Sequence, residues 1–259
     1  MSMSRYLAIA WLPALFACHS ANDGKPTAER VVERPRADND NDDDDKPSAT
    51  GKQNPLTATT APATTGPART MSFDGDKVDG APAGFTFGRT GQGAQGKWVI
   101  RAETSAPSGG NVLAQIDADA TDYRFPVAIA NEPVLADVRL SVKCKQIAGK
   151  VDQGCGLIFR AADPDNYYVT RANALEDNVR LYHVVKGTRR QFAGWDGKVK
   201  SGVWHDLRVD AKGDHFDVYF DGQKVIDATD QTFKNAGKIG LWTKADSIIY
   251  FDDLTVAPL

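Results

Sequence analysis

Residues 154–171 read GCGLIFRAADPDNYYVTR, and this stretch decides the fold. An apolar run ends at Arg160, the turn sequence DPDN follows at 163–166, and Tyr167 opens a second apolar run. Proline suits the second position of a β-turn, and aspartate and asparagine side chains bond to the backbone of such turns. The stretch therefore predicts two antiparallel strands joined by a tight turn.

The same kind of pattern continues on both sides of this stretch. Residues 136–144, ADVRLSVKC, alternate apolar and polar side chains as a half-buried strand does, and residues 203–212 do likewise. Asp221-Gly222 supplies a tight hairpin turn. No segment of helical length carries an apolar stripe of period 3.6. About a dozen short strands without helices predict one all-β domain over residues 71–259, a sandwich or jelly roll.

The N-terminus of the 259-residue chain is typical of an exported protein. Arg5 precedes an apolar run over residues 6–16, which is shorter than the roughly 20 residues that span a bilayer and suits a signal peptide. The run ends in LFAC at 15–18, which resembles the bacterial lipobox. That resemblance implies a signal peptide over residues 1–17 and a lipid on Cys18. The alternative is an ordinary signal peptide with a chance cysteine. His19, rather than aspartate, follows the cysteine, and the resemblance to Gram-negative lipoproteins then implies sorting to the outer membrane.

Residues 18–70 are predicted to be a disordered tether. They contain almost no large apolar side chains, so they cannot bury enough surface to offset the entropy of folding. The acidic run NDNDDDD at 39–45 repels itself and extends the chain; the alternative is a cation-binding or interaction tail.

The two remaining cysteines, Cys144 and Cys155, are predicted to form a disulfide, because an even pair in an exported chain meets an oxidising compartment. Each lies on the alternating apolar face of its strand. We expect the bond to join them across a hairpin that turns near residues 148–150.

Motifs spread over residues 71–259 resemble concanavalin A-like domains of the laminin G and 3-keto-disaccharide hydrolase group. They are the stretch 154–171, FDGD at 73–76, GVWHDLRV at 202–209, FDG at 220–222, GKIGLW at 237–242 and FDDL at 251–254. The resemblance implies a concanavalin A-like jelly-roll sandwich. In the hydrolase branch the first strand reads Asn-Ser-Gly where this chain has Gly154-Cys155-Gly156, so two polar groups of that branch are missing.

The sequence excludes several kinds of chemistry. Retaining glycosidases of the laminarinase type carry two glutamates on one strand, about 5–5.5 Å apart. The predicted domain has only Glu103, Glu132 and Glu176, far apart in sequence, so this mechanism is excluded. His183, His205 and His215 have no zinc-ligand spacing and are interpreted as ordinary strand residues. A net charge of −3 without a basic cluster argues against nucleic acid.

Sugar recognition remains, because sugars stack on aromatic rings and bond to planar polar side chains. Tyr182 and Trp242 are residues of the right type, although Trp98, Trp204 and Trp242 are expected in the core. The predicted ligand-binding residues are Arg160, Tyr168, Arg171, Trp195 and Asp196. A structural calcium ion is the one cofactor considered, with Asp74, Asp76 and Asp253 as its candidate ligands.

These observations favour an outer-membrane or cell-surface lipoprotein, predicted to be monomeric, whose jelly roll binds a glycan. Its only membrane contact is the lipid anchor. The alternatives are an enzyme of the 3-keto-glycoside hydrolase type and a non-catalytic protein-interaction domain of laminin G type.

Overall fold

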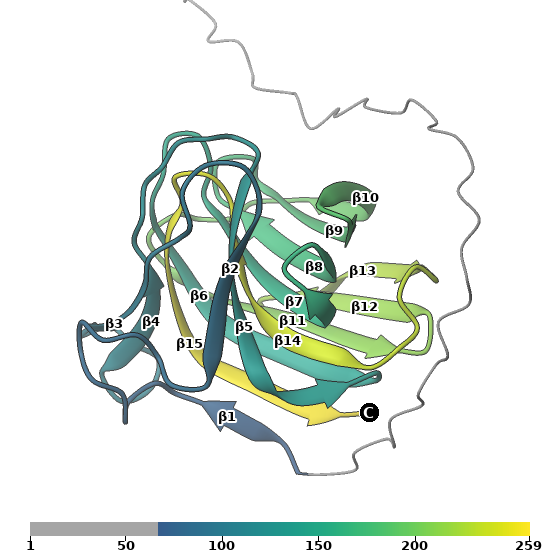
Figure 1. Ribbon diagram of the computed structural model, residues 1–259, viewed down its shortest axis with the longest axis horizontal. Helices are drawn as coiled ribbons and strands as arrows, with labels where there is room; N and C mark the ends of the chain where they lie inside the picture. The colour runs from purple at the N-terminus through teal and green to yellow at the C-terminus, as the bar shows by residue number, and fades with distance from the viewer. Residues whose placement is uncertain (1–66) are drawn as a thin grey trace, which may run out of the picture. The chain divides into compact units, whose positions relative to one another are not determined.

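Two antiparallel sheets make up residues 67–259, the part of the chain that this computed structural model describes (Figure 1). The eight-stranded sheet has the order β13 (Gln223–Thr229), β12 (His215–Phe220), β11 (Trp204–Lys212), β6 (Val138–Ala148), β15 (Ile248–Pro258), β4 (Asn111–Gln115), β3 (Trp98–Ala102), with β1 (Arg69–Met71) also paired to β15. The seven-stranded sheet has the order β10 (Thr188–Asp196), β9 (Asn178–Val185), β8 (Asn166–Asn173), β7 (Gly154–Asp163), β14 (Gly237–Thr243), β5 (Arg124–Leu135), β2 (Phe85–Gly91). The predicted all-β jelly-roll fold is confirmed.

No helix long and apolar enough to cross a membrane occurs within residues 67–259. The predicted signal peptide, Cys18 and the acidic run of the tether lie outside the described residues.

The stretch 154–171 forms β7, a turn and β8, as its sequence predicts. Asp163 and Asn166 face each other across the turn. The Asp163 carboxylate accepts hydrogen bonds from the Asp165 backbone N–H at 2.8 Å and from the Asn166 side-chain amide at 2.9 Å. The ladder shifts register between Phe159 and Asp163, and Arg160 in this bulge has a φ of +50°. The bulge turns the Arg160 side chain away from the simple alternation of the strand.

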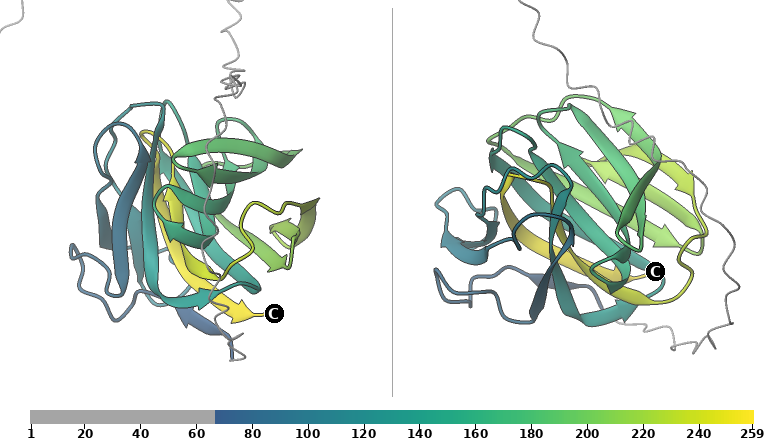
Figure 2. Two further views of the ribbon diagram at one scale, coloured as in Figure 1. Left: turned by 45° about the vertical axis from the view of Figure 1, so that its right-hand side comes forward. Right: turned by 45° about the horizontal axis from the view of Figure 1, so that its top comes forward.

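The two sheets face each other (Figure 2), and the larger cluster of buried apolar side chains packs between them. Alternate residues of β6, such as Leu140 and Val142, pack there against alternate residues of β7, such as Leu157 and Phe159. The seven-stranded sheet also carries a second buried cluster on its other face, which we call the outer face of that sheet. Its members are Phe125, Val127, Ile129, Ile158, Ala161, Tyr167, Val169, Tyr182, Val184 and Trp242.

The disulfide joins Cys144 to Cys155, as predicted, with an S–S distance of 2.12 Å. The expected hairpin is wrong, because Cys144 lies on β6 of the eight-stranded sheet and Cys155 on β7 of the seven-stranded sheet. The bond therefore crosses the core between the sheets. Alternation places both sulfurs on inward-facing positions, but it does not tell whether consecutive strands share a sheet.

The crossing from β6 to β7 is built by a tight turn at residues 149–153. Gly149 has a φ of +149°, and a Cβ there would lie 1.8 Å from the Asp152 carbonyl oxygen, so only glycine fits. The Asp246 carboxylate accepts the backbone N–H groups of Lys150 at 2.7 Å, Val151 at 3.0 Å and Asp152 at 3.0 Å. These bonds satisfy the turn's donors and hold it against the segment after β14.

We expect the double variant Cys144→Ser/Cys155→Ser to unfold in urea with a free energy lower by about 2–3 kcal/mol, because it removes a cross-link over a short loop. Non-reducing urea titrations followed by tryptophan fluorescence measure this difference, with reduced wild-type protein as the control. An unchanged unfolding midpoint would contradict a stabilising inter-sheet bond.

Candidate functional site

Aromatic rings and one arginine form the centre of the outer face of the seven-stranded sheet. Phe125 and Trp242 stack with ring centroids 5.3 Å apart. The Arg189 guanidinium lies 4.8 Å from the ring centroid of Phe125, 4.5 Å from Tyr182 and 5.9 Å from Trp242. Each of these distances is within the range of a cation–π contact. The face therefore combines flat apolar rings with a planar cation.

Two glycines of β7 make room for the Trp242 ring. A Cβ at Gly154 would lie 3.3 Å from Trp242 Cζ3 and 2.8 Å from Asp152 Oδ1. A Cβ at Gly156 would lie 3.1 Å from Trp242 Cε3 and 3.2 Å from Arg171 Cβ. The two departures from the hydrolase pattern thus have physical reasons: Trp242 and Asp152 take the space of a side chain at 154, and Cys155 forms the disulfide with Cys144.

A network of polar groups continues this face toward the end of the sheet. The Arg171 guanidinium donates to the Glu176 carboxylate at 2.7 Å, to the Tyr182 hydroxyl at 3.0 Å and to the Asn178 side-chain oxygen. Arg171 and Asn178 are buried, whereas the Glu176 side chain is 26% exposed. The network therefore reaches the surface at Glu176.

Asp152 is a buried acid at the same end. The Asn173 amide donates to its Oδ1 at 3.1 Å, and Lys244 Nζ lies 3.5 Å from its Oδ2. Burial raises the pKa of Asp152 to about 6, although the positive charges of Lys244 and Arg171 act in the opposite direction. A carboxyl group with a pKa in this range can hold or release a proton near neutral pH.

We call this set the Arg171 cluster: Asp152, Arg171, Asn173, Glu176, Asn178, Tyr182 and Lys244. It presents guanidinium, amide, carboxylate, phenol and ammonium groups beside the rings of Phe125 and Trp242. Sugar hydroxyls bond to planar polar groups of this kind, and the buried rings of Phe125 and Trp242 hold these groups in place from below.

Among the residues proposed from sequence, the structure brings Arg171 together with Tyr182 and Trp242 on this face. Arg160 lies elsewhere and is buried. Its guanidinium donates to the backbone oxygens of Ala136 at 2.7 Å, Phe233 at 2.9 Å and Gly213 at 2.6 Å, so it ties three loops together. The positive φ in the β7 bulge explains why the alternation misplaced it.

Tyr168, Trp195 and Asp196 also lie away from the Arg171 cluster. Tyr168 is buried in the core between the sheets, and its hydroxyl donates to Asp230 at 2.5 Å. Trp195 is partly buried, with its ring centroid 6.3 Å from that of Phe220, and the exposed Asp196 pairs with Arg180 at 2.6 Å.

The three tryptophans expected in the core differ from one another. Trp98 and Trp242 are buried, the latter in the outer-face cluster. Trp204 is only partly buried, and its Nε1 donates to Ser105 at 3.3 Å.

The candidate calcium ligands gather around the loop that precedes β4. The Asp74 carboxylate accepts the backbone N–H groups of Gly110 at 2.9 Å and Asn111 at 3.1 Å, which lowers the pKa of Asp74. Asp253 accepts from the Ser108 hydroxyl at 2.7 Å. Asp76 meets the loop through its backbone oxygen, 3.4 Å from the Asn111 amide nitrogen. The carboxylates of Asp74 and Asp253 thus already bind donors of the loop, and calcium stays a prediction.

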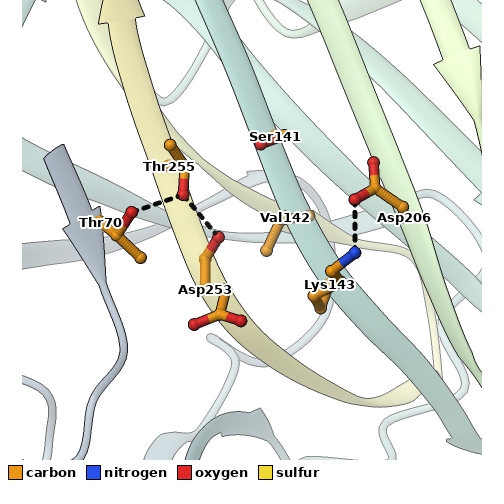
Figure 3. Close-up of a pocket in the computed structure, with 7 residues that line it drawn as sticks. All are labelled: Thr70, Ser141, Val142, Lys143, Asp206, Asp253 and Thr255. Carbon is orange, nitrogen blue, oxygen red and sulfur yellow. Dashed lines mark hydrogen bonds and ion pairs between the residues drawn. The ribbon is translucent and has the colours of Figure 1, made fainter. Parts of the chain in front are cut away.

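A polar cavity of about 370 Å³ opens on the outer face of the eight-stranded sheet (Figure 3). Within it Lys143 pairs with Asp206 at 2.7 Å, and the hydroxyls of Thr70 and Thr255 are 2.8 Å apart. Its lining is Thr70, Ser141, Val142, Lys143, Asp206, Asp253 and Thr255, none of which is aromatic. The cavity therefore offers hydroxyl, ammonium and carboxylate groups without an aromatic ring.

Several members of the Arg171 cluster were missed from sequence: Asp152, Asn173, Glu176, Asn178 and Lys244. Asn173 could have been predicted, because it follows Arg171 by two positions and therefore lies on the same face of β8. The others lie in turns or at strand ends, where alternation carries no signal.

Comparisons with known proteins agree with this architecture. A family model described as the 3-keto-alpha-glucoside-1,2-lyase-like domain matches residues 73–257. Levanase of Bacillus subtilis (strain 168) is 29% identical over 107 residues, which are 40% of this chain and only 15% of that enzyme.

Two solved structures share the fold. The carbohydrate binding module CBM66 from Bacillus subtilis has a TM-score of 0.55 at 22% identity, covering 67% of this chain and 95% of that module. The cellulose induced protein Cip1 has a TM-score of 0.53 at 9% identity, covering 73% of this chain and 96% of that one. Because the family model covers most of the chain, the protein belongs to the 3-keto-alpha-glucoside-1,2-lyase-like domain family.

Proposed function

We propose that the protein binds a glycan or glycoside on the outer face of its seven-stranded sheet, at the Arg171 cluster. The observation that carries this proposal is the Arg189 guanidinium over three aromatic rings, next to the hydrogen-bonded Arg171, Glu176 and Tyr182. Membership of a family named for a keto-glucoside lyase and the shared fold with a carbohydrate binding module support it.

The ligand meets the rim of this face first. The most exposed side chains of the cluster are those of Glu176, 26% exposed, and Lys244, 12% exposed. Arg180, the cross-strand partner of Arg171, has a side chain that is 16% exposed. These groups supply an acceptor and two donors for hydroxyls. The rings of Phe125, Tyr182 and Trp242 beneath these groups are buried, so they support the polar groups that meet the ligand.

A second function, glycoside cleavage, is favoured by one observation. Asp152 is a buried carboxyl whose pKa is raised to about 6, in the range of a general acid or base. Turnover of a 3-keto-glucoside that is lost in Asp152→Asn, with ligand binding retained, would support this second function.

The protein is further proposed to be an outer-membrane lipoprotein, anchored through Cys18 and carried on the tether. Two features support this: the LFAC motif at 15–18 and the tether composition. On such a tether, a glycan-binding domain would reach ligands at some distance from the membrane.

Binding on a glycan array that includes fructans and α-glucosides, followed by calorimetry, tests the leading function with the full chain in a non-ionic detergent. We expect Glu176→Gln to weaken binding by roughly 10–100-fold, because it removes a charged hydrogen-bond partner of similar size. Lys143→Met, in the cavity of the other sheet, is the matched control and is expected to bind as wild type does.

An equal loss in Glu176→Gln and Lys143→Met would contradict the assigned face. Failure of the wild type to bind any glycan would overturn the function and favour a protein-interaction domain of laminin G type.

Stability should fall as pH rises through 6, because of Asp152. Its pKa is raised from 3.8 to about 6 on folding, so the folded state binds the proton more tightly and the stabilisation is fully present only below about pH 4. Between pH 5 and pH 7.5 the free energy of unfolding should drop by roughly 1–1.5 kcal/mol from this group. Urea titrations of Asp152→Asn should show a flatter pH profile. Asp122→Asn, which removes the exposed partner of Lys244, serves as control. Parallel profiles for wild type and Asp152→Asn would show that Asp152 is already ionised at pH 5.

Mass spectrometry of the membrane-extracted protein tests the anchor. The expected N-terminal residue is Cys18 carrying acyl chains, and Cys18→Ser should release the protein from the membrane fraction. An unmodified mature N-terminus at another residue would overturn the anchor.

A further inference from the structure

Three ligand-type side chains meet on the outward face of the β12–β13 hairpin, in the eight-stranded sheet. His215 and Asp217 are two residues apart on β12, and Asp227 is the direct cross-strand partner of Asp217. His215 Nε2 lies 3.2 Å from Asp217 Oδ1 and 3.4 Å from Asp227 Oδ1. One ligand atom from each residue lies within 4.8 Å of the other two.

This group already holds a cation. Lys224 Nζ lies 2.8 Å from Asp217 Oδ1 and 2.5 Å from Asp227 Oδ2. The two carboxylates would repel each other without a positive charge between them. The ammonium group supplies this charge, and a metal ion at the same place would also supply it. The Lys224 side chain is 41% exposed, and such exposed lysine pairs hold their partners weakly.

We propose that His215, Asp217 and Asp227 bind a divalent transition metal ion of the zinc class, which displaces the Lys224 ammonium group. One imidazole nitrogen and two carboxylate oxygens suit such an ion, and three protein ligands leave a position for water. Calcium prefers six to eight oxygen ligands, so two carboxylates and a nitrogen discriminate against it.

The hairpin supplies the geometry for this site. Residues two apart on a strand point to the same side, which places His215 beside Asp217. The register of β12 and β13 then brings Asp227 opposite Asp217, and a bulge after Val218 shifts the ladder next to it. None of these residues belongs to the Arg171 cluster, which lies on the other sheet. The metal site is therefore independent of the proposed glycan function.

The experiment measures Zn²⁺ binding by calorimetry and by the change in melting temperature. The parent protein is the full chain in a non-ionic detergent. Lys224→Met is the decisive variant, because it removes the competing ammonium group and keeps all three ligands. His183→Ala provides a matched control at a partly exposed histidine outside the site.

We expect one Zn²⁺ per chain, reversed by EDTA, with Ca²⁺ at the same concentration giving no signal. His215→Ala and Asp227→Asn should each weaken binding at least tenfold, whereas Lys224→Met should tighten it by about tenfold. His183→Ala should bind as the parent does.

Binding that persists unchanged in His215→Ala would place the ion elsewhere in the chain and overturn the site. A Lys224→Met variant that folds with the parent's secondary structure but binds no more tightly would overturn the displacement. Absence of Zn²⁺ binding in both the parent and Lys224→Met would overturn the proposal as a whole.

Discussion

The indole of Trp242 occupies space that β7 leaves open only because residues 154 and 156 are glycines. The buried ring stacks against Phe125 and lies under the Arg189 guanidinium, so it is the apolar support of the polar groups on the outer face of the seven-stranded sheet. Larger residues at 154 or 156 would push the ring away, and Arg189 would lose part of its stack. The arrangement of this face therefore depends on glycine at positions 154 and 156.

The charges around this surface are too buried to be there for stability alone. Taking Asp152 and Arg171 out of water costs free energy that their mutual attraction recovers only in part, and an apolar replacement of such a network is often as stable. The pKa of Asp152 is raised because burial disfavours its charged form. The buried carboxyl, the buried guanidinium and the two buried amides on this face are the groups on which the proposed glycan binding rests.

The sequence predicted the class of fold because alternation and turn chemistry are local. It predicted the Cys144–Cys155 pair because these two cysteines remain in a chain expected to be exported, and both alternate with core residues. It could not predict that the bond joins different sheets, because strand assignment depends on the turn at Gly149 and on Asp246, which lies nearly a hundred residues away. Alternation also set Tyr167 and Tyr168 on opposite faces without telling which one faces the core.

For the site residues too, local patterns were predictable and contacts between distant parts of the chain were not. Arg171 was found because it sits on a regular strand, and Tyr182 shares its face across the β8–β9 ladder. Arg160 was misplaced because a bulge and a positive φ redirect it toward three backbone carbonyls. Asp152 and Lys244 carry no sequence signal, because turns far apart in the chain bring them together.

Strand β7 contributes both to the disulfide that joins the two sheets and to the face proposed to bind the ligand. On β7, Cys155 points inward to the disulfide while its neighbours Gly154 and Gly156 face outward beneath Trp242. The period of two in a strand couples these roles, because a one-residue slip of β7 would put a glycine in the place of the cysteine. The disulfide fixes the register of β7 against the opposite sheet, and that register is what puts the glycines under the ring. The disulfide between the sheets and the packing of Trp242 on β7 thus both depend on the register of β7.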